Sequence, residues 1–157
     1  MIEQIYTFFT IEMTYLWLNL GVLPFWFLLI FFPNSKISKF FVTSIFPIFI
    51  LSLVYLYLLY ISYSNGYDFL QNFKLYLGFN EISELFENQY FLIIFWTHFL
   101  TINLFCGAWI VKDSQIYDVN KFLVFLPLVI AYLIGPIGLI FYWVIRIFYA
   151  KKITLYD

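Results

Sequence analysis

Two polar residues inside the segment FWTHFLTINLFCGAWIVKDS, residues 95–114, are the first candidates for chemistry. They are His98, the only histidine of the chain, and the amide Asn103. A histidine titrates near neutral pH and can deliver or remove a proton, whereas an amide can orient an oxygen atom. Such groups are rare and costly inside a segment that crosses a membrane, so we take both as candidate catalytic residues. A purely structural role, in which His98 bridges two helices by hydrogen bonds, stays open.

Other kinds of site are excluded by residue counts. A single cysteine, Cys106, cannot form a disulfide within the chain, and one histidine cannot build a multi-histidine zinc site. The net charge of −1 argues against a nucleic-acid-binding surface, and the lack of a glycine-rich phosphate motif argues against a nucleotide site. We predict no metal site, although carboxylates could still hold a hard cation, and we leave any cofactor unknown.

The composition indicates which elements must position these residues. Hydrophobic residues make up 64% and charged residues 11%, whereas soluble domains have roughly 45–50% and 25%. Charge-free runs cover residues 13–35, 40–67, 88–111 and 122–145, each longer than the roughly 20 residues that cross a bilayer as a helix. We therefore predict one all-α integral membrane domain over residues 1–157, a four-helix transmembrane bundle. Its helices are expected at about 10–32, 41–63, 90–111 and 122–149.

A polar connection separates the second and third predicted helices. The pair Asn65-Gly66 predicts a turn, after which Asp68 could cap FLQNFKLYL and Asn80 could cap EISELF. The apolar residues of the second stretch follow helical spacing. We expect short interfacial helices here. The predicted ends of the bundle carry four basic residues each, so the orientation in the membrane stays open.

The depths of the polar residues follow if each apolar run is centred on the bilayer. His98 then lies level with Tyr55, with Gly135-Pro136 and with Pro24. Because proline frees a backbone carbonyl, we expect helices one and four to be broken at this level, beside the imidazole and a phenol. Packing alone is the alternative reason for the glycines and prolines. At 100° per residue His98 and Asn103 point in different directions, so they are weak evidence for a single pocket.

The charged residues near the helix ends suggest one ion pair. Glu12 lies on a common helix face with Tyr15 and Asn19. We expect Arg146 at the same membrane side, paired with Glu12 or Glu87. The alternative is that Arg146 extends to the lipid headgroups. Lys112-Asp113, just beyond the third helix, is expected to be a solvated boundary.

Two stretches also carry a family pattern. It consists of Trp96-x-His98, Leu104-Phe105, Gly107, Trp109, Asp113 and, on the last helix, Gly135-Pro136-x-Gly138-Leu139. With LGVLPFWFLLIFFP as a matching first helix, the sequence resembles the abscisic-acid-deficient-4-like membrane family, whose plant members are needed to make neoxanthin from violaxanthin. Where the family usually has an aspartate before Leu-Phe, this chain has Asn103.

The resemblance implies action on a carotenoid or related isoprenoid, by isomerisation or epoxide rearrangement. Epoxide rearrangement needs one proton delivered to oxygen and another removed from carbon. We assign the titrating role to His98, the orientation of the oxygen to Tyr55 or Asn103, and substrate binding to Trp96, Trp109, Gly135 and Pro136.

Alternative functions stay open. A non-catalytic partner that holds a pigment or lipid for another membrane protein would need the same groove. A small transporter or channel is less favoured, since the spans lack a run of carboxylates and four helices form a channel only as an oligomer. We expect a multi-pass protein of a bacterial cell membrane, in contact with membrane lipid, and we leave a homo-oligomer open.

Overall fold

The computed structural model describes residues 10–154, and all secondary structure in this range is helical. The all-α expectation is confirmed. The helices are α2 (Ile11–Phe31), α3 (Lys36–Phe41), α4 (Phe46–Ser64), the 3-10 helix η1 (Phe69–Tyr76), α5 (Phe79–Glu87), α6 (Gln89–Ile116), α7 (Lys121–Leu133) and α8 (Gly135–Ala150).

Three segments among the described residues are long and apolar enough to cross a membrane. They are Ile11–Phe31, Lys36–Ser64 and Gln89–Ile116. The first contains Pro24 without a break, so the expectation of a broken first helix is wrong. The second consists of α3 and α4, separated by residues 42–45, which places the start of α4 later than predicted.

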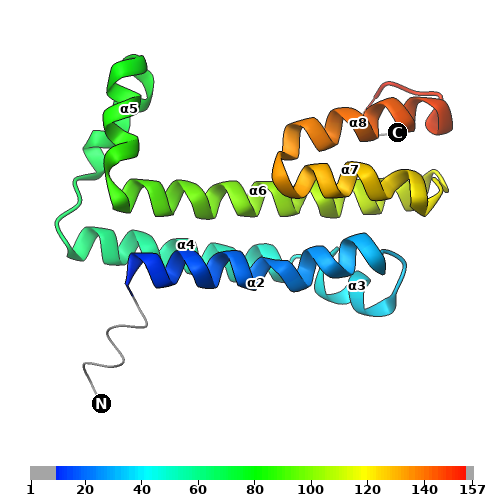
Figure 1. Cartoon of the computed structure of the whole chain (residues 1–157), viewed down its shortest axis with the longest axis horizontal. Coiled ribbons are helices and arrows are strands. Elements are labelled where there is room, and N and C mark those ends of the chain that lie inside the picture. The colour runs from blue at the N-terminus through cyan, green and yellow to red at the C-terminus, as the bar shows by residue number, and fades with distance from the viewer. Residues whose placement is uncertain (1–9, 155–157) are drawn as a thin grey trace. The chain divides into compact units, whose positions relative to one another are not determined.

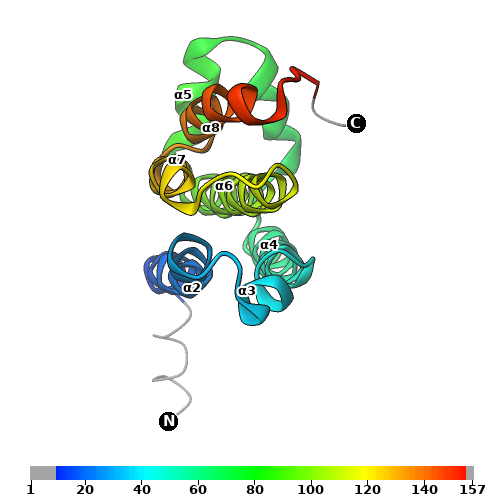
Figure 2. The same ribbon diagram turned by 90° about the vertical axis from the view of Figure 1, so that its right-hand side faces the viewer.

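The expected break of the fourth helix near Gly135-Pro136 is confirmed, and it divides the predicted fourth span into two shorter helices. Ile134 separates α7 from α8 and has an extended backbone, with φ −144° and ψ 90°. Pro136 follows in the first turn of α8, where its missing N–H and fixed φ are tolerated. The chain reverses here, and α8 folds back along α7 (Figures 1 and 2). The described residues thus contain three candidate spans and a helical hairpin, and the bundle of four spanning helices stays a prediction.

The hairpin packs closely because of one glycine. A Cβ atom added to Gly138 would lie 2.5 Å from the Cα atom of Ala131, so only glycine allows this approach of α8 to α7. Ala131 and Gly138 thus serve close packing between α7 and α8.

The chain divides into two compact units, which are described separately below. The first comprises residues 1–20 and 50–100, and the second comprises residues 21–49 and 101–157. The helices α2, α4 and α6 contribute residues to both units. The expected single domain stays a prediction.

The short helices expected after the second span are present in the first unit. The Asp68 side chain caps η1 by accepting a hydrogen bond from Leu70 N at 2.9 Å, as predicted. The capping role of Asn80 is wrong, because α5 begins two residues earlier than predicted, at Phe79 after Gly78, without a side-chain cap. Lys74 Nζ joins the two helices through Glu84 Oε2 at 3.0 Å.

Tyr67 anchors this connection. It is buried with Leu85 and Phe91, and its hydroxyl donates to Asn72 Oδ1 at 2.6 Å. Burial, and then the Asp68 carboxylate, raise the pKa of Tyr67, so the phenol keeps its proton and remains a donor at neutral pH.

Candidate functional site

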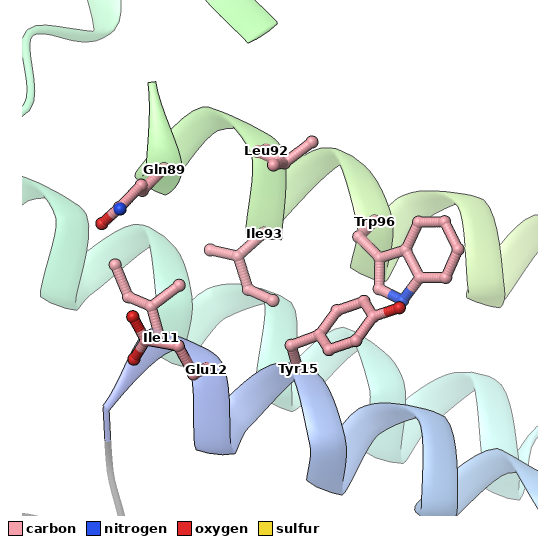
Figure 3. A pocket seen from close by; sticks show the side chains of 7 residues that line it. All are labelled: Ile11, Glu12, Tyr15, Gln89, Leu92, Ile93 and Trp96. Atoms are coloured by element: carbon pink, nitrogen blue, oxygen red, sulfur yellow. The ribbon is translucent and has the colours of Figure 1, made fainter. Parts of the chain in front are cut away.

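A groove in the first unit combines apolar walls with polar groups. It has a volume of about 330 Å³ and lies between α2 and α6 (Figure 3). Its lining residues are Ile11, Glu12, Tyr15, Gln89, Leu92, Ile93 and Trp96. We call it the Trp96 groove. Its size is at the lower end of the range of small-molecule sites, so a long ligand would place only one end in it.

Two aromatic side chains form one end of the Trp96 groove. The rings of Tyr15 and Trp96 lie 5.6 Å apart at an angle of 42°, and Figure 3 shows the phenol end of Tyr15 turned towards the indole. Trp96 Nε1 is buried without a hydrogen-bond partner. An unpaired buried donor costs free energy, so an acceptor atom that reached this N–H would remove that cost.

A carboxylate and an amide lie at the other end. Figure 3 shows the ends of Glu12 and Gln89 on the side of the groove away from Trp96. Glu12 is exposed and stands in the first turn of α2, where the helix dipole favours a negative charge. The groove therefore offers a proton acceptor, Glu12, and a hydroxyl donor, Tyr15, on either side of apolar contacts. Among the residues described, no cluster of potential metal ligands occurs.

Two predicted catalytic residues also lie in the first unit. His98 is exposed and Tyr55 is partly buried, and neither lines the Trp96 groove. Thr97 and Leu100 are the buried residues next to His98, which leaves this histidine on an exposed face of α6. The catalytic roles of His98 and Tyr55 stay predictions.

The second unit contains a buried polar cluster that the sequence did not reveal. Arg146 Nε lies 2.8 Å from Asp113 Oδ2, and the Tyr142 hydroxyl donates to the same oxygen at 2.6 Å. Arg146 also donates to the Tyr117 hydroxyl at 3.2 Å and to the carbonyl of Lys152 at 3.4 Å. The pair therefore ties α8 to the end of α6.

This cluster corrects two expectations. The carboxylate paired with Arg146 is Asp113, in place of Glu12 or Glu87. Asp113 is 6% exposed and Arg146 is fully buried, so neither is solvated or extended to headgroups. The turn at Ile134 explains the difference, because it reverses α8 and returns Arg146 to the level of the end of α6. One signal was present in the sequence: Asp113 belongs to the family pattern, and Arg146 is the only arginine.

Asn103 is buried at the turn between α7 and α8. Its Nδ2 atom lies 3.5 Å from the carbonyl oxygen of Tyr132. In a continuous helix this carbonyl would accept a hydrogen bond from the N–H of residue 136, but Pro136 has no N–H. A Cβ atom on Gly135 would collide with the Asn103 side chain. The amide thus supports the break in the helix, which is a structural position, and its catalytic role stays a prediction.

The predicted substrate-binding residues do not share one groove. Trp96 lines the groove of the first unit, whereas Trp109 lines a second-unit groove of about 410 Å³ with Phe105 and Lys112. Gly135 is buried and Pro136 is exposed, and neither lines these two grooves. Trp109 also packs edge-on against Tyr142 at 5.8 Å, next to the buried cluster.

Comparison with known proteins gives a family match. A sequence model described as ABA DEFICIENT 4-like matches residues 13–142. The chain is 32% identical over 97 residues to the chloroplastic protein ABA DEFICIENT 4 of Arabidopsis thaliana. This alignment covers 60% of the chain and 44% of that relative, so the chain spans less than half the length of the protein it matches. No solved structure matches.

Proposed function

Because the chain belongs to the ABA DEFICIENT 4-like family, we propose that it acts on a carotenoid or related isoprenoid in a membrane. The reaction is an isomerisation or an epoxide rearrangement. The observation that carries the proposal is the family match over residues 13–142, and three apolar segments of spanning length in residues 10–154 support the membrane location. A bacterial cell membrane stays a prediction.

The Trp96 groove is the site we assign to one end of the substrate. Its apolar side chains suit a hydrocarbon, and the unpaired Trp96 Nε1 suits a hydroxyl or epoxide oxygen. An isolated donor of this kind favours a ligand that brings an acceptor, because binding then removes the cost of the unmade hydrogen bond.

The rearrangement itself needs one proton acceptor and one donor. In the proposed site Glu12 removes a proton from carbon, the carbon–oxygen bond of the epoxide breaks, and Tyr15 supplies a proton to the oxygen. Atoms and charge balance, since the substrate and product are isomers and a proton returns from the Glu12 carboxyl to the Tyr15 phenolate. General acid–base catalysis of this kind contributes about 10²- to 10⁴-fold in rate.

The test is expression in a host that accumulates an epoxy-carotenoid, followed by chromatography of the pigments. Glu12→Gln is expected to lower turnover by about 10²-fold or more, and Trp96→Phe by about 2- to 10-fold through the lost hydrogen bond. The matched control is Glu87→Gln, which removes an exposed carboxylate that does not line the groove. Normal turnover in Glu12→Gln, or equal losses in the control, would exclude this site.

His98→Ala belongs in the same series. If His98 is the titrating group, this variant loses turnover and Glu12→Gln keeps it. If the groove is the site, the opposite holds. The comparison therefore decides between the exposed imidazole and the groove.

The second candidate function is a non-catalytic binder of pigment or lipid. It is favoured by the exposure of both Glu12 and Tyr15, since acid–base residues usually work with water excluded. A binder would co-purify with pigment, would leave the pigment profile of the host unchanged, and would lose its pigment in Trp96→Ala.

A further inference from the structure

A polar groove in the second unit lies at the end of two apolar segments. Its volume is about 210 Å³, and its lining residues are Pro33, Asn34, Lys39, Ser114, Gln115, Asp118, Val119, Lys121 and Val124. We call it the lysine groove. Residues 33 and 34 come just after α2, and residues 114 and 115 belong to the last turn of α6, so the groove lies where two candidate spans end.

One hydrogen-bond pair fixes a wall of this groove. Gln115 Nε2 donates to the carbonyl of Pro33 at 3.0 Å and to Asn34 Oδ1 at 3.1 Å. These contacts hold the loop after α2 against the end of α6. The groove is therefore built by contacts between distant parts of the sequence, which distinguishes it from a chance hollow between surface side chains.

The charges of the lysine groove favour a singly charged anion. Lys39 and Lys121 contribute two ammonium groups and Asp118 one carboxylate, which leaves +1. Lys121 is also the first residue of α7, whose N-cap is Asn120, and the positive end of that helix dipole adds to the attraction. A phosphodiester carries one negative charge and matches this balance.

The surroundings indicate that the anion is attached to an apolar chain. In the sequence, Phe31 and Phe32 come directly before the groove residue Pro33, and Phe40 comes directly after Lys39. All three phenylalanines are exposed. Phe122 is 77% exposed next to Lys121, and the Lys121 ammonium lies 5.4 Å from its ring centroid. Aromatic and basic residues gather in this way where a membrane helix meets the headgroup layer. A free phosphate ion would leave the exposed parts of these apolar side chains uncovered.

We propose that the lysine groove binds the phosphate of an anionic phospholipid. The two ammonium groups contact the phosphate oxygens, Asp118 meets a hydroxyl of the headgroup, and the exposed phenylalanines contact the acyl chains. This binding is independent of the reaction assigned to the Trp96 groove, whose residues are all different.

The test measures binding to the purified full chain in a neutral detergent. Short-chain phosphatidylglycerol, short-chain phosphatidylcholine and inorganic phosphate are titrated separately, with native mass spectrometry to count bound lipid. Phosphatidylglycerol is expected to bind more tightly than phosphatidylcholine and to be displaced by salt. Equal binding of the two lipids would overturn the proposal, and so would inorganic phosphate binding as tightly as phosphatidylglycerol.

Charge variants distinguish lipid binding in the lysine groove from general attraction between an anionic lipid and the lysines of the chain. Lys39→Gln with Lys121→Gln is expected to weaken phosphatidylglycerol binding roughly 30-fold, from about 1 kcal/mol per lysine at 1.4 kcal/mol per tenfold. Asp118→Asn is expected to tighten it. The matched control, Lys36→Gln with Lys151→Gln, removes the same charge outside the groove and should change affinity less than threefold. Equal losses in both double variants would overturn the site, and an unchanged melting temperature without lipid confirms that each variant folds.

Discussion

The Nε atom of Arg146 lies 2.8 Å from Asp113 Oδ2, with both side chains withdrawn from solvent. The same carboxylate oxygen accepts the Tyr142 hydroxyl at 2.6 Å, so one atom joins two residues of α8 to α6. A buried ion pair adds little stability over a well-packed apolar pair, but removal of one partner leaves an uncompensated buried charge. The contact is therefore a sensitive point for the packing of the hairpin.

Asp113→Asn tests this contact, because the amide keeps the shape and removes the charge. We expect the free energy of unfolding to fall by about 3–5 kcal/mol. Denaturant titration of the purified chain in detergent measures the change. Adding Arg146→Gln should recover part of the loss, since the second substitution removes the charge left unpaired.

The control for Asp113→Asn is Glu84→Gln, which breaks the exposed Lys74–Glu84 pair of the first unit. Exposed pairs contribute about 0–1 kcal/mol, so the control should unfold almost as the parent does. A loss of the same small size in both variants would show that the Asp113 pair is accessible to water.

Tyr142→Phe removes one hydroxyl from the same cluster. The Tyr142 side chain is fully buried, and a hydrogen bond to a charged acceptor contributes about 1.5–3 kcal/mol, so we expect a loss in that range. Tyr149→Phe is the matched control, because Tyr149 lies on the same helix and is 42% exposed. Its change should stay within about 0.5 kcal/mol, and a comparable effect in the two variants would contradict the assigned hydrogen bond.

Much of the fold followed from the sequence because hydrophobic length is a strong signal. The charge-free runs located α2, α4 and α6, and the Asp68 cap located η1. In the fourth run the break at Gly135-Pro136 was predicted from the proline, but the reversal of the chain there was not. The hydropathy of this run continues across Ile134, whereas the reversal depends on backbone geometry at one residue, on Pro136 and on the close approach of Gly138 to Ala131.

The candidate site was harder to predict. Trp96 and Glu12 were both identified, but for different sites, because a contact between helices far apart in sequence cannot be read from either helix alone. His98 was favoured because of its rarity, and rarity does not determine which way a side chain points. Asp113 was dismissed as solvated because its position next to Lys112 resembled a helix end, whereas α6 continues to Ile116.

Asn103→Leu tests whether the Asn103 amide stabilises the break between α7 and α8. The substitution removes the donor that faces the Tyr132 carbonyl and leaves a buried acceptor unpaired, which costs about 1–3 kcal/mol. Asn103→Asp, which restores the residue expected in relatives, should destabilise as much where the new carboxyl is ionised, because a carboxylate cannot donate, and less where it is protonated, because the acid can. Thermal unfolding in detergent measures both variants.

Asn19→Leu is the control for that series. Its amide donates to the Tyr15 carbonyl at 2.7 Å, within the helix α2, where that carbonyl already has the usual backbone partner. We therefore expect a change within about 0.5 kcal/mol. If Asn103→Leu changes stability as little as Asn19→Leu does, water or another group must donate a hydrogen bond to the Tyr132 carbonyl.

Two glycine substitutions should change stability in opposite directions. Gly138→Ala places a methyl group against the backbone of Ala131, which cannot move aside as a side chain could, and overpacking of this kind costs about 1–3 kcal/mol. Gly21→Ala adds the same methyl group within α2, where nothing lies within 4 Å, and replacing a helical glycine by alanine stabilises by about 0.5–1 kcal/mol. Denaturant titration of both variants against the parent gives the two signs. Because the added atoms are identical, only the hairpin can account for a loss at Gly138, and a gain there would mean that α7 and α8 do not pack face to face at this point.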